Sequence, residues 1–234
     1  MPKKKLGIIG GMGPLATADL FRKIVLSTKA TCDNGHIRIF IDNNTEIPDR
    51  TAAILSGGPS PVPYMADSLR RLEECGAECI VMPCNTAHYY LPQLQAMTSL
   101  PFISILDAAA SECAERFPGR TAEVLATAGT LKTGIYDKAL ASHGVPFILP
   151  DDEDISRLMR VSYDGVKKGA DLETVRSDWE TVIENGRRRG AEVFILACTE
   201  LPIAAAAFGT RADFIDATEA LAKAAVRFCG FETV

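Results

Sequence analysis

The sequence lacks the features of membrane and secreted proteins. No run of apolar residues approaches the ~20 that a membrane-spanning helix needs, so no association with a membrane is expected. The first residues pass from three lysines through a short apolar segment into glycines, without the longer apolar centre and cleavage site of a signal peptide. We therefore expect a cytoplasmic protein.

Clusters of basic residues are also scarce. Lys3, Lys4 and Lys5 form the only tight basic run near a terminus, and 25 basic residues against 30 acidic ones give a net charge of −5. A nucleic-acid-binding protein needs a clustered positive face for phosphate contacts. No nucleic-acid partner is therefore expected.

The cysteines do not form a recognisable framework. They number seven, an odd count, and their spacings match neither a disulfide scaffold nor a zinc ribbon. Cys79, Cys84 and His88 could be imagined as metal ligands, but Cys79 falls within an expected strand and no fourth ligand has a suitable spacing. We expect no metal site, and we expect most of the cysteines to be small buried apolar residues.

What is present indicates two α/β domains. A chain of 234 residues, 47% of them hydrophobic, exceeds the ~100–150 residues of a typical domain. Strands are expected near 6–10, 37–42, 79–83, 102–106, 122–127, 145–149, 193–197 and 213–216. Helices are expected near 14–29, 62–75, 86–97, 107–116, 132–142, 151–168, 171–189, 200–207 and 217–228. Because strands and helices alternate, the sheets are predicted to be parallel.

An internal repeat organises the chain. Gly-Ala-Glu precedes an apolar strand that ends at Cys84, and the same tripeptide precedes a second strand that ends at Cys198, 114 residues later. Each half also has a cation between its first turn and its cysteine. These cations are Arg50 and Lys167, which lie 117 residues apart. The first turn of each half also repeats, with Gly13, Leu15 and Thr17 matching Gly129, Leu131 and Thr133 at a displacement of 116. Features repeated in the same order predict two pseudo-symmetric halves.

The end of the chain sets the expected domain limits. The last strand and helix follow the second copy of the cysteine loop, so we expect them to cross back and complete the first domain. The first domain is then 1–99 plus 209–234, and the second is 100–208. Ligands bind at the carboxyl ends of parallel strands, and we expect these ends to face one cleft.

Cys84 and Cys198 are the candidate catalytic residues. Each follows a strand and precedes a helix, whose dipole and free N–H groups favour a thiolate and lower its pKa. Inverting a carbon next to a carboxylate requires a base on one face and an acid on the other, and two thiols serve both roles. Hydrogen-bond donors and cations would stabilise the enolate-like carbanion; suitable ones are Arg50, Lys167, Asn85, Thr86 and Thr199.

Four motifs resemble the aspartate/glutamate racemase family. They are Gly10-Gly11-Met12-Gly13-Pro14, Pro48-Asp49-Arg50-Thr51, Met82-Pro83-Cys84-Asn85-Thr86-Ala87-His88 and Cys198-Thr199-Glu200. The resemblance covers nearly the whole chain and is nearest to the aspartate racemase branch, because Met12 and Glu200 stand where glutamate racemases carry Asp and His.

This resemblance implies two pseudo-symmetric α/β domains with the active site in the cleft between them. It implies a homodimer that acts on a small-molecule amino-acid substrate and racemises aspartate, glutamate or both. It also implies that this reaction needs neither pyridoxal phosphate nor another cofactor. Cys84 and Cys198 are the implied acid/base pair, and Arg50 and Lys167 hold or polarise the substrate carboxylates. The implied substrate-binding residues are Met12, Arg50, Asn85, Thr86, Ala87, Thr127, Lys167 and Thr199.

Other interpretations stay open at this stage. Related isomerases and hydantoin racemases share the two-cysteine plan. The segment Gly11–Ala16 fits a dinucleotide-binding loop, and Asp42 ends the next expected strand, although it lies 31 residues after Gly11 where about 20 is usual. A two-lobed binding protein without catalysis is a third possibility. His88 could reach Cys84 across one helical turn or simply pack in the core.

Overall fold

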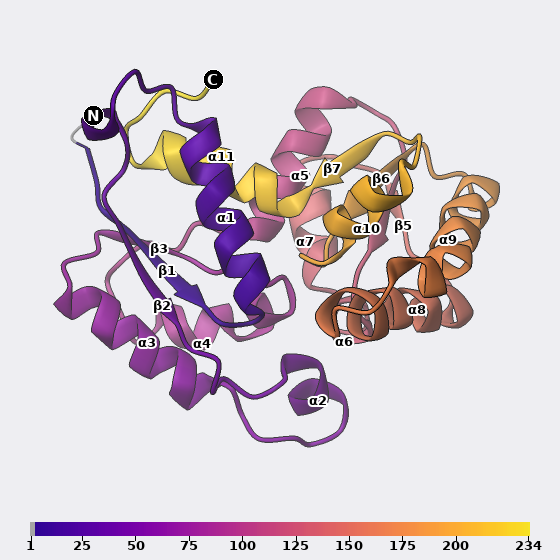
Figure 1. The fold of residues 1–234 in the computed structure, drawn as a ribbon, viewed down its shortest axis with the longest axis horizontal. Coiled ribbons are helices and arrows are strands. Elements are labelled where there is room, and N and C mark those ends of the chain that lie inside the picture. The colour runs from indigo at the N-terminus through magenta and orange to yellow at the C-terminus, as the bar shows by residue number, and fades with distance from the viewer. Residues whose placement is uncertain (1–2) are drawn as a thin grey trace. The chain divides into compact units, whose positions relative to one another are not determined.

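Strands and helices alternate along the computed structural model, which describes residues 3–234 (Figure 1). The strands of this part of the chain are β1 (Leu6–Gly10), β2 (Ile39–Asn43), β3 (Cys79–Val81), β4 (Ala122–Leu125), β5 (Phe147–Ile148), β6 (Val193–Leu196) and β7 (Phe214–Asp216). They form two sheets, in the orders β2-β1-β3 and β5-β4-β6-β7, and every strand pair is parallel. The prediction of an α/β fold with parallel sheets is confirmed.

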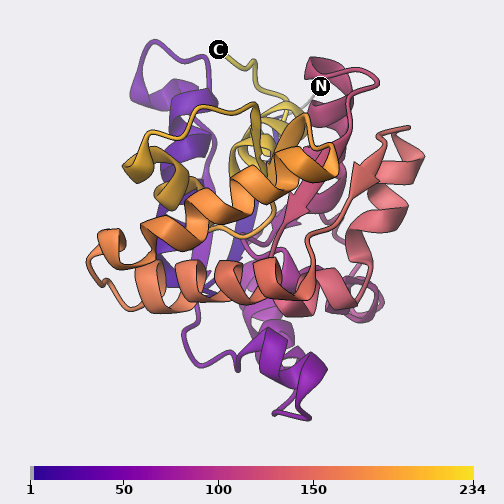
Figure 2. The same ribbon diagram turned by 90° about the vertical axis from the view of Figure 1, so that its right-hand side faces the viewer.

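Helices connect the strands. The α-helices are α1 (Pro14–Ser27), α2 (Arg50–Leu55), α3 (Val62–Glu74), α4 (Leu91–Gln95), α5 (Ile105–Arg116), α6 (Ala128–Lys132), α7 (Ile135–Ser142), α8 (Asp152–Met159), α9 (Arg176–Arg189), α10 (Leu201–Phe208) and α11 (Ala217–Phe228). Three 3-10 helices, η1 (Asp33–Gly35), η2 (Thr86–Tyr90) and η4 (Leu172–Val175), and a π-helix, η3 (Arg160–Lys167), complete the described elements. Figure 2 shows α8 and α9 side by side, in agreement with their packing contacts.

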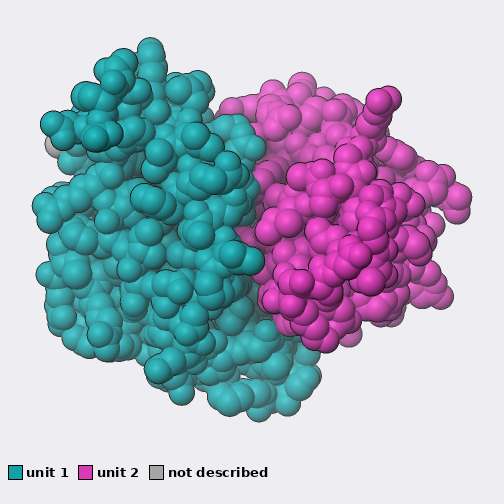
Figure 3. All heavy atoms as spheres, viewed as in Figure 1, with its two compact units in different colours: residues 1–108, 218–234 teal, residues 109–217 magenta. Residues whose placement is uncertain are grey.

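The chain divides into two compact units, coloured separately in Figure 3. One contains residues 1–108 and 218–234, and the other contains residues 109–217. The domain limits expected from the repeat, 1–99 with 209–234 and 100–208, stay a prediction.

The two sheets show the internal repeat at the level of structure. In one sheet β1 lies between β2 and β3, and β3 precedes Cys84. In the other sheet β4 lies between β5 and β6, and β6 precedes Cys198. Phe102 forms a parallel bridge with Ile80 of β3. Its place beside β3 corresponds to the place of β7 beside β6 in the other sheet. A helix follows in both cases, α5 in one half and α11 in the other.

Several expected elements differ from the structure. The strand near 102–106 is reduced to the bridge at Phe102, because Pro101 has no N–H to donate and α5 already begins at Ile105. The helix near 86–97 is a 3-10 helix followed by α4. The helix near 132–142 is divided into α6 and α7 by Gly134, whose φ of 62° is left-handed and favours glycine.

The end of the chain also departs from expectation. The last strand was expected to cross back to the first domain, but β7 pairs in parallel with β6 in the four-stranded sheet. Only the helix that follows, from Thr218 onward, belongs to the first compact unit. The chain therefore returns to the first unit after β7, one element later than the sequence indicates.

Each unit has its own apolar core. In the first, β1 is buried along its whole length, and Met65, Leu69 and Met82 belong to the cluster beside it. In the second, Trp179 and Phe194 are fully buried, and the Trp179 indole donates to the Thr210 hydroxyl at 2.6 Å.

Candidate active site

Cys84 lies in a tight turn three residues beyond the end of β3. Its backbone N–H donates to the Met82 carbonyl at 2.9 Å, which closes a three-residue turn around Pro83. The residue is 7% exposed and belongs to the same core cluster as Met12 and Ala87. Asn85, the N-cap of η2, and Thr86, its first residue, are also buried.

His88 fixes the position of this turn. Its Nδ1 lies 2.9 Å from the Cys84 carbonyl oxygen, and its Nε2 accepts a hydrogen bond from the Ile105 N–H at 3.3 Å. Because Nε2 is the acceptor, the proton of the neutral ring is on Nδ1 and is donated to Cys84. Burial lowers the pKa of His88 to about 4. His88 is therefore a neutral positioning residue for the cysteine turn.

This assignment predicts an acid-sensitive stability. The unfolded chain protonates His88 at about 6.5, whereas the folded chain does so only near 4, so the unfolded state binds more protons between these values. Stability is therefore lost as the pH falls through this window, by about 2–3 kcal/mol between pH 7.5 and 4.5. We expect His88→Asn, which keeps a donor for Cys84 but cannot titrate, to weaken the protein at pH 7.5 and to reduce this pH dependence.

Urea unfolding of both proteins at the two pH values measures the effect. The matched control is His143→Asn, because His143 is exposed just after α7. An unchanged pH dependence in His88→Asn would show that the buried imidazole is not the titrating group.

The glycine turn after β1 is held by side chains. The Thr17 hydroxyl accepts from the Gly11 N–H at 2.9 Å and donates to the Gly13 carbonyl at 3.1 Å. Gly11 has a φ of 89°, and a Cβ there would collide with the backbone of Asn44. Only glycine fits this position.

Arg50 connects this turn to the cysteine loop. It is the first residue of α2, whose N-cap Asp49 accepts from the Ala52 N–H at 2.8 Å, and α2 packs against η2. The guanidinium is buried and donates to the Met12 carbonyl at 3.0 Å and to the Pro48 carbonyl at 3.1 Å. The structure thus gathers the expected residues of the first unit around the ends of β1 and β3.

Cys198 lies two residues beyond the end of β6, in the second unit. It is 6% exposed, and its thiol donates to Glu200 Oε2 at 2.9 Å. The Ser162 hydroxyl donates to the sulfur at 3.6 Å, and Lys167 Nζ lies 4.0 Å from Glu200 Oε1. The Thr199 hydroxyl donates to Glu200 Oε2 at 3.1 Å. A buried carboxylate is therefore the centre of this group.

The electrostatics at Cys198 differ from the sequence-based expectation. A helix N-terminus was expected to lower the pKa of this thiol, but burial and the nearby Glu200 charge raise it well above its usual value. Lys167 and Ser162 act in the opposite direction without reversing the result. Burial, together with a negative charge two residues away, outweighs the partial charge of a helix end.

A π-helix brings Ser162 and Lys167 to the same group. Its hydrogen bonds join residues five apart, and these two residues are five apart within η3. The Lys167 ammonium also lies 4.0 Å from the centre of the Tyr163 ring. A straight α-helix over 151–168, as expected from the sequence, would not stack them on one face, and Ser162 was missed for this reason.

Two more residues of the second unit belong to this end of the sheet or interact with Cys198. Thr127, the N-cap of α6, follows β4, the neighbour of β6, and its hydroxyl lies 3.1 Å from that of Thr130. Tyr136 was not predicted. It is buried, and its pKa is raised mainly by burial and further by the charge of Cys198.

Other features of the chain lie apart from these groups. Cys79 Sγ is 3.6 Å from Cys229 Sγ, so this cysteine packs against the end of α11. Within residues 3–234, no group of three or more His, Cys, Asp or Glu side chains is placed to hold a metal ion. No helix of the described residues is long and apolar enough to cross a bilayer.

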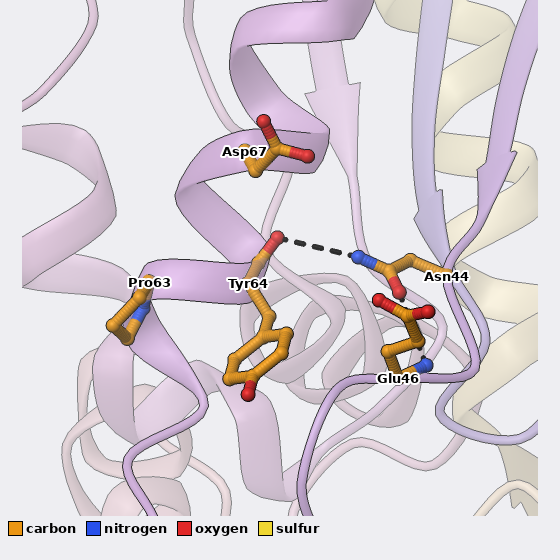
Figure 4. A pocket seen from close by; sticks show the side chains of 5 residues that line it. All are labelled: Asn44, Glu46, Pro63, Tyr64 and Asp67. Atoms are coloured by element: carbon orange, nitrogen blue, oxygen red, sulfur yellow. Dashed lines mark hydrogen bonds between the residues drawn. The ribbon is translucent and has the colours of Figure 1, made fainter.

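A surface cavity of about 260 Å³ also lies outside the candidate site. It is lined by Asn44, Glu46, Pro63, Tyr64 and Asp67, and the Asn44 amide points to the Tyr64 carbonyl at 3.5 Å (Figure 4). None of these residues is buried, and none is an expected site residue. We assign no catalytic role to this cavity.

Comparison with known proteins settles the family. The family model for Asp/Glu/Hydantoin racemase matches residues 9–225, most of the chain. The chain belongs to the Asp/Glu/Hydantoin racemase family. Racemases are isomerases, so the prediction of an isomerase is confirmed, and family membership favours racemisation over the dinucleotide-binding alternative.

Members of this family with similar sequence or structure include aspartate racemases and a racemase of broad specificity. The aspartate racemase of Picrophilus torridus has a TM-score of 0.84 at 31% identity, with 98% of this chain and 96% of that one covered. A putative Asp/Glu racemase of Yersinia pestis has a TM-score of 0.80 at 27% identity, with 97% and 99% covered. The broad specificity amino-acid racemase RacX of Bacillus subtilis is 26% identical over 94% of this chain and 96% of its own length.

Proposed function

We propose that this protein racemises aspartate, glutamate or both without a cofactor, with Cys84 and Cys198 as the acid/base pair. The observation that carries the proposal is the equivalent placement of the two residues. Each is nearly buried and lies just beyond a parallel strand, and the two strands, β3 and β6, have matching places in their sheets. The proposal requires the two units to bring these thiols to opposite faces of one substrate carbon.

Proton transfer then balances within the pair. One cysteine, as thiolate, removes the α-proton, while the other, as thiol, donates its proton to the opposite face of the carbanion. The first cysteine is left as thiol and the second as thiolate, so the protein is ready for the opposite enantiomer. No electron transfer is involved.

Cations and hydrogen-bond donors stabilise the carbanion and hold the substrate. We assign Arg50 to one carboxylate of the substrate and Lys167 to the other, since each lies in the same unit as one of the thiols. Positive charge near a carboxylate favours its enolate form more than its ground state. The remaining expected contacts are Met12, Asn85, Thr86, Ala87, Thr127 and Thr199.

The proposed substrate class follows from this charge arrangement. Two cations fit an amino acid with two carboxylates, and the 31% identical Picrophilus torridus protein is an aspartate racemase. One methylene changes discrimination by only about 1–3 kcal/mol, so aspartate and glutamate are both proposed. The homodimer and the cytoplasmic location stay predictions.

Deuterium exchange tests the proposal. The purified protein is incubated in D₂O without pyridoxal phosphate with L-aspartate, L-glutamate, L-alanine or a 5-substituted hydantoin. We expect loss of the α-hydrogen signal and decay of optical rotation to zero with one or both acidic amino acids, and much slower exchange with alanine, which lacks the second carboxylate. A Cys84→Ser/Cys198→Ser double variant is the blank.

Three results would contradict the proposal. Exchange with none of the substrates would reject acidic amino-acid racemisation. Exchange only after addition of pyridoxal phosphate would reject the cofactor-independent mechanism. Exchange with the hydantoin alone would assign the chain to the hydantoin racemases of the same family.

A further inference from the structure

Glu200 is a buried carboxylate that the proposed reaction leaves without a role. It lies two residues after Cys198 at the start of α10, and both of its oxygens are engaged. Oε2 accepts from the Cys198 thiol at 2.9 Å and from the Thr199 hydroxyl at 3.1 Å. Oε1 faces the Lys167 ammonium at 4.0 Å. The thiol proton of Cys198 is thus directed at a carboxylate.

We propose that Glu200 is a positioning residue that keeps the proton on Cys198 in the ligand-free protein, so that Cys198 starts a cycle as the acid. The proposal rests on the proposed function, because it assigns starting roles within the two-cysteine pair. Cys84 then starts as the base. The reverse step begins from the opposite protonation state, which Glu200 disfavours.

The charges around the sulfur support this assignment. Glu200 repels a thiolate at Cys198 and accepts a hydrogen bond only from the protonated form. Two groups of η3 favour the thiolate, Ser162 by its hydrogen bond to the sulfur and Lys167 by its charge, and the buried Tyr136 of α7 interacts electrostatically with Cys198. Burial is the largest effect that raises the pKa of the Cys198 thiol, and the Glu200 charge acts in the same direction, so that together they prevail over Lys167 and Ser162.

The experiment measures the proton on Cys198 directly. In a Cys84→Ser background, which removes coupling between the two thiols, alkylation of Cys198 by iodoacetamide is followed from pH 6 to 11 by peptide mass spectrometry. Because only the thiolate reacts, the midpoint of the rate profile gives the pKa of Cys198. We expect this midpoint to lie above the ordinary value of about 8.5.

Variants of Glu200 separate its charge from its packing. Glu200→Gln keeps the shape but removes the charge, and we expect it to lower the midpoint by about one pH unit or more. Glu200→Asp keeps the charge, and its midpoint should lie between those of the protein with Glu200 and of Glu200→Gln. The matched control is Glu184→Gln, which removes an exposed carboxylate of the same unit that pairs with Arg188, and it should leave the midpoint unchanged.

The pH profile of racemisation gives a second readout in the protein with both cysteines. The basic limb of kcat/KM reports loss of the essential acid in the free enzyme, and Glu200→Gln should shift this limb to lower pH. A residue that only stabilises the fold would lower the rate without moving the limb.

The outcomes distinguish the two proposals. A Cys198 midpoint at or below about 8.5 in the Cys84→Ser parent, or a midpoint that Glu200→Gln does not change, would overturn the role of Glu200 even if racemisation is observed. The expected midpoints without racemisation would support Glu200 as the group that holds the Cys198 proton and would reject the proposed function. If Glu200→Gln does not fold, the midpoints of the Cys84→Ser parent and of Glu200→Asp in that background still decide the question.

Discussion

Replacement of either Cys84 or Cys198 by serine is expected to lower the racemisation rate by about 10²–10⁴-fold, the usual contribution of a general acid or base. A serine hydroxyl is far less acidic than a thiol, so it neither removes the α-proton nor donates one at neutral pH. Chiral chromatography of aspartate or glutamate incubated with each variant measures the loss. The two variants should be similarly impaired, because racemisation needs both groups.

Exchange without racemisation should reveal which face each thiol serves. In Cys84→Ser the remaining cysteine can still remove and return a proton on its own face, so α-deuterium exchange should persist for one enantiomer and be lost for the other. Cys198→Ser should show the opposite preference. NMR of each pure enantiomer in D₂O follows this exchange.

A buried cysteine outside the candidate site provides the control. Cys113 is fully buried in α5, and Cys113→Ser should reduce stability while leaving racemisation nearly unchanged. Equal and mild losses in all three serine variants would contradict the two-base assignment.

Arg189→Met is expected to lower the free energy of unfolding by about 3–5 kcal/mol, more than any other substitution considered above, because it removes the cation from a buried ion-pair network. Arg189 Nη2 donates to Glu123 Oε1 at 2.6 Å, and Nη1 lies 2.8 Å from Asp154 Oδ2. Both carboxylates are fully buried, so the variant leaves Glu123 buried without its cation, whereas Asp154 keeps Arg157 at 2.9 Å. The midpoint of thermal unfolding should fall by roughly 6–20 °C.

The pH dependence identifies the cause of this loss. Burial already raises the pKa of Glu123, and Arg189 opposes that rise. Without Arg189 the pKa of Glu123 in the folded state rises further above its value in the unfolded state. The folded protein then binds more protons than the unfolded chain between these two values, so stability falls as the pH increases. The destabilisation by Arg189→Met should therefore be larger at pH 8 than at pH 5.

The neighbouring arginine is a matched control. Arg188 pairs with Glu184 at 3.3 Å, and both side chains are at least half exposed. Surface pairs contribute about 0–1 kcal/mol, so Arg188→Met should change the unfolding midpoint little. Equal effects of the two variants would show that the Glu123 network does not carry the stability.

The sequence predicted the positions of most strands and the parallel sheets, because the apolar segments are clear and alternate with helices. Cys84 and Cys198 were located by the internal repeat, which depends on local residue identity and on position after a strand. The last strand was assigned to the other domain because no local pattern specifies the partner of a strand. That choice depends on tertiary packing, here of β7 on β6.

The surroundings of Cys198 were less predictable. Ser162 reaches the sulfur only because η3 is a π-helix, and the sequence carries no evident signal for this geometry. The roles of His88 and Glu200 depend on hydrogen bonds whose direction appears only in three dimensions. A glutamate two residues after a cysteine that ends a buried strand was nevertheless a visible signal for a charge close to the thiol.

The central claim concerns two sulfurs and one carbon, and a crystal structure of the protein with a bound unreactive aspartate analogue tests it most directly. Our account predicts that Cys84 Sγ and Cys198 Sγ lie on opposite sides of the α-carbon, each at about 3–4 Å, as proton transfer requires. Both sulfurs on the same side, or either one directed away from the ligand, would contradict it.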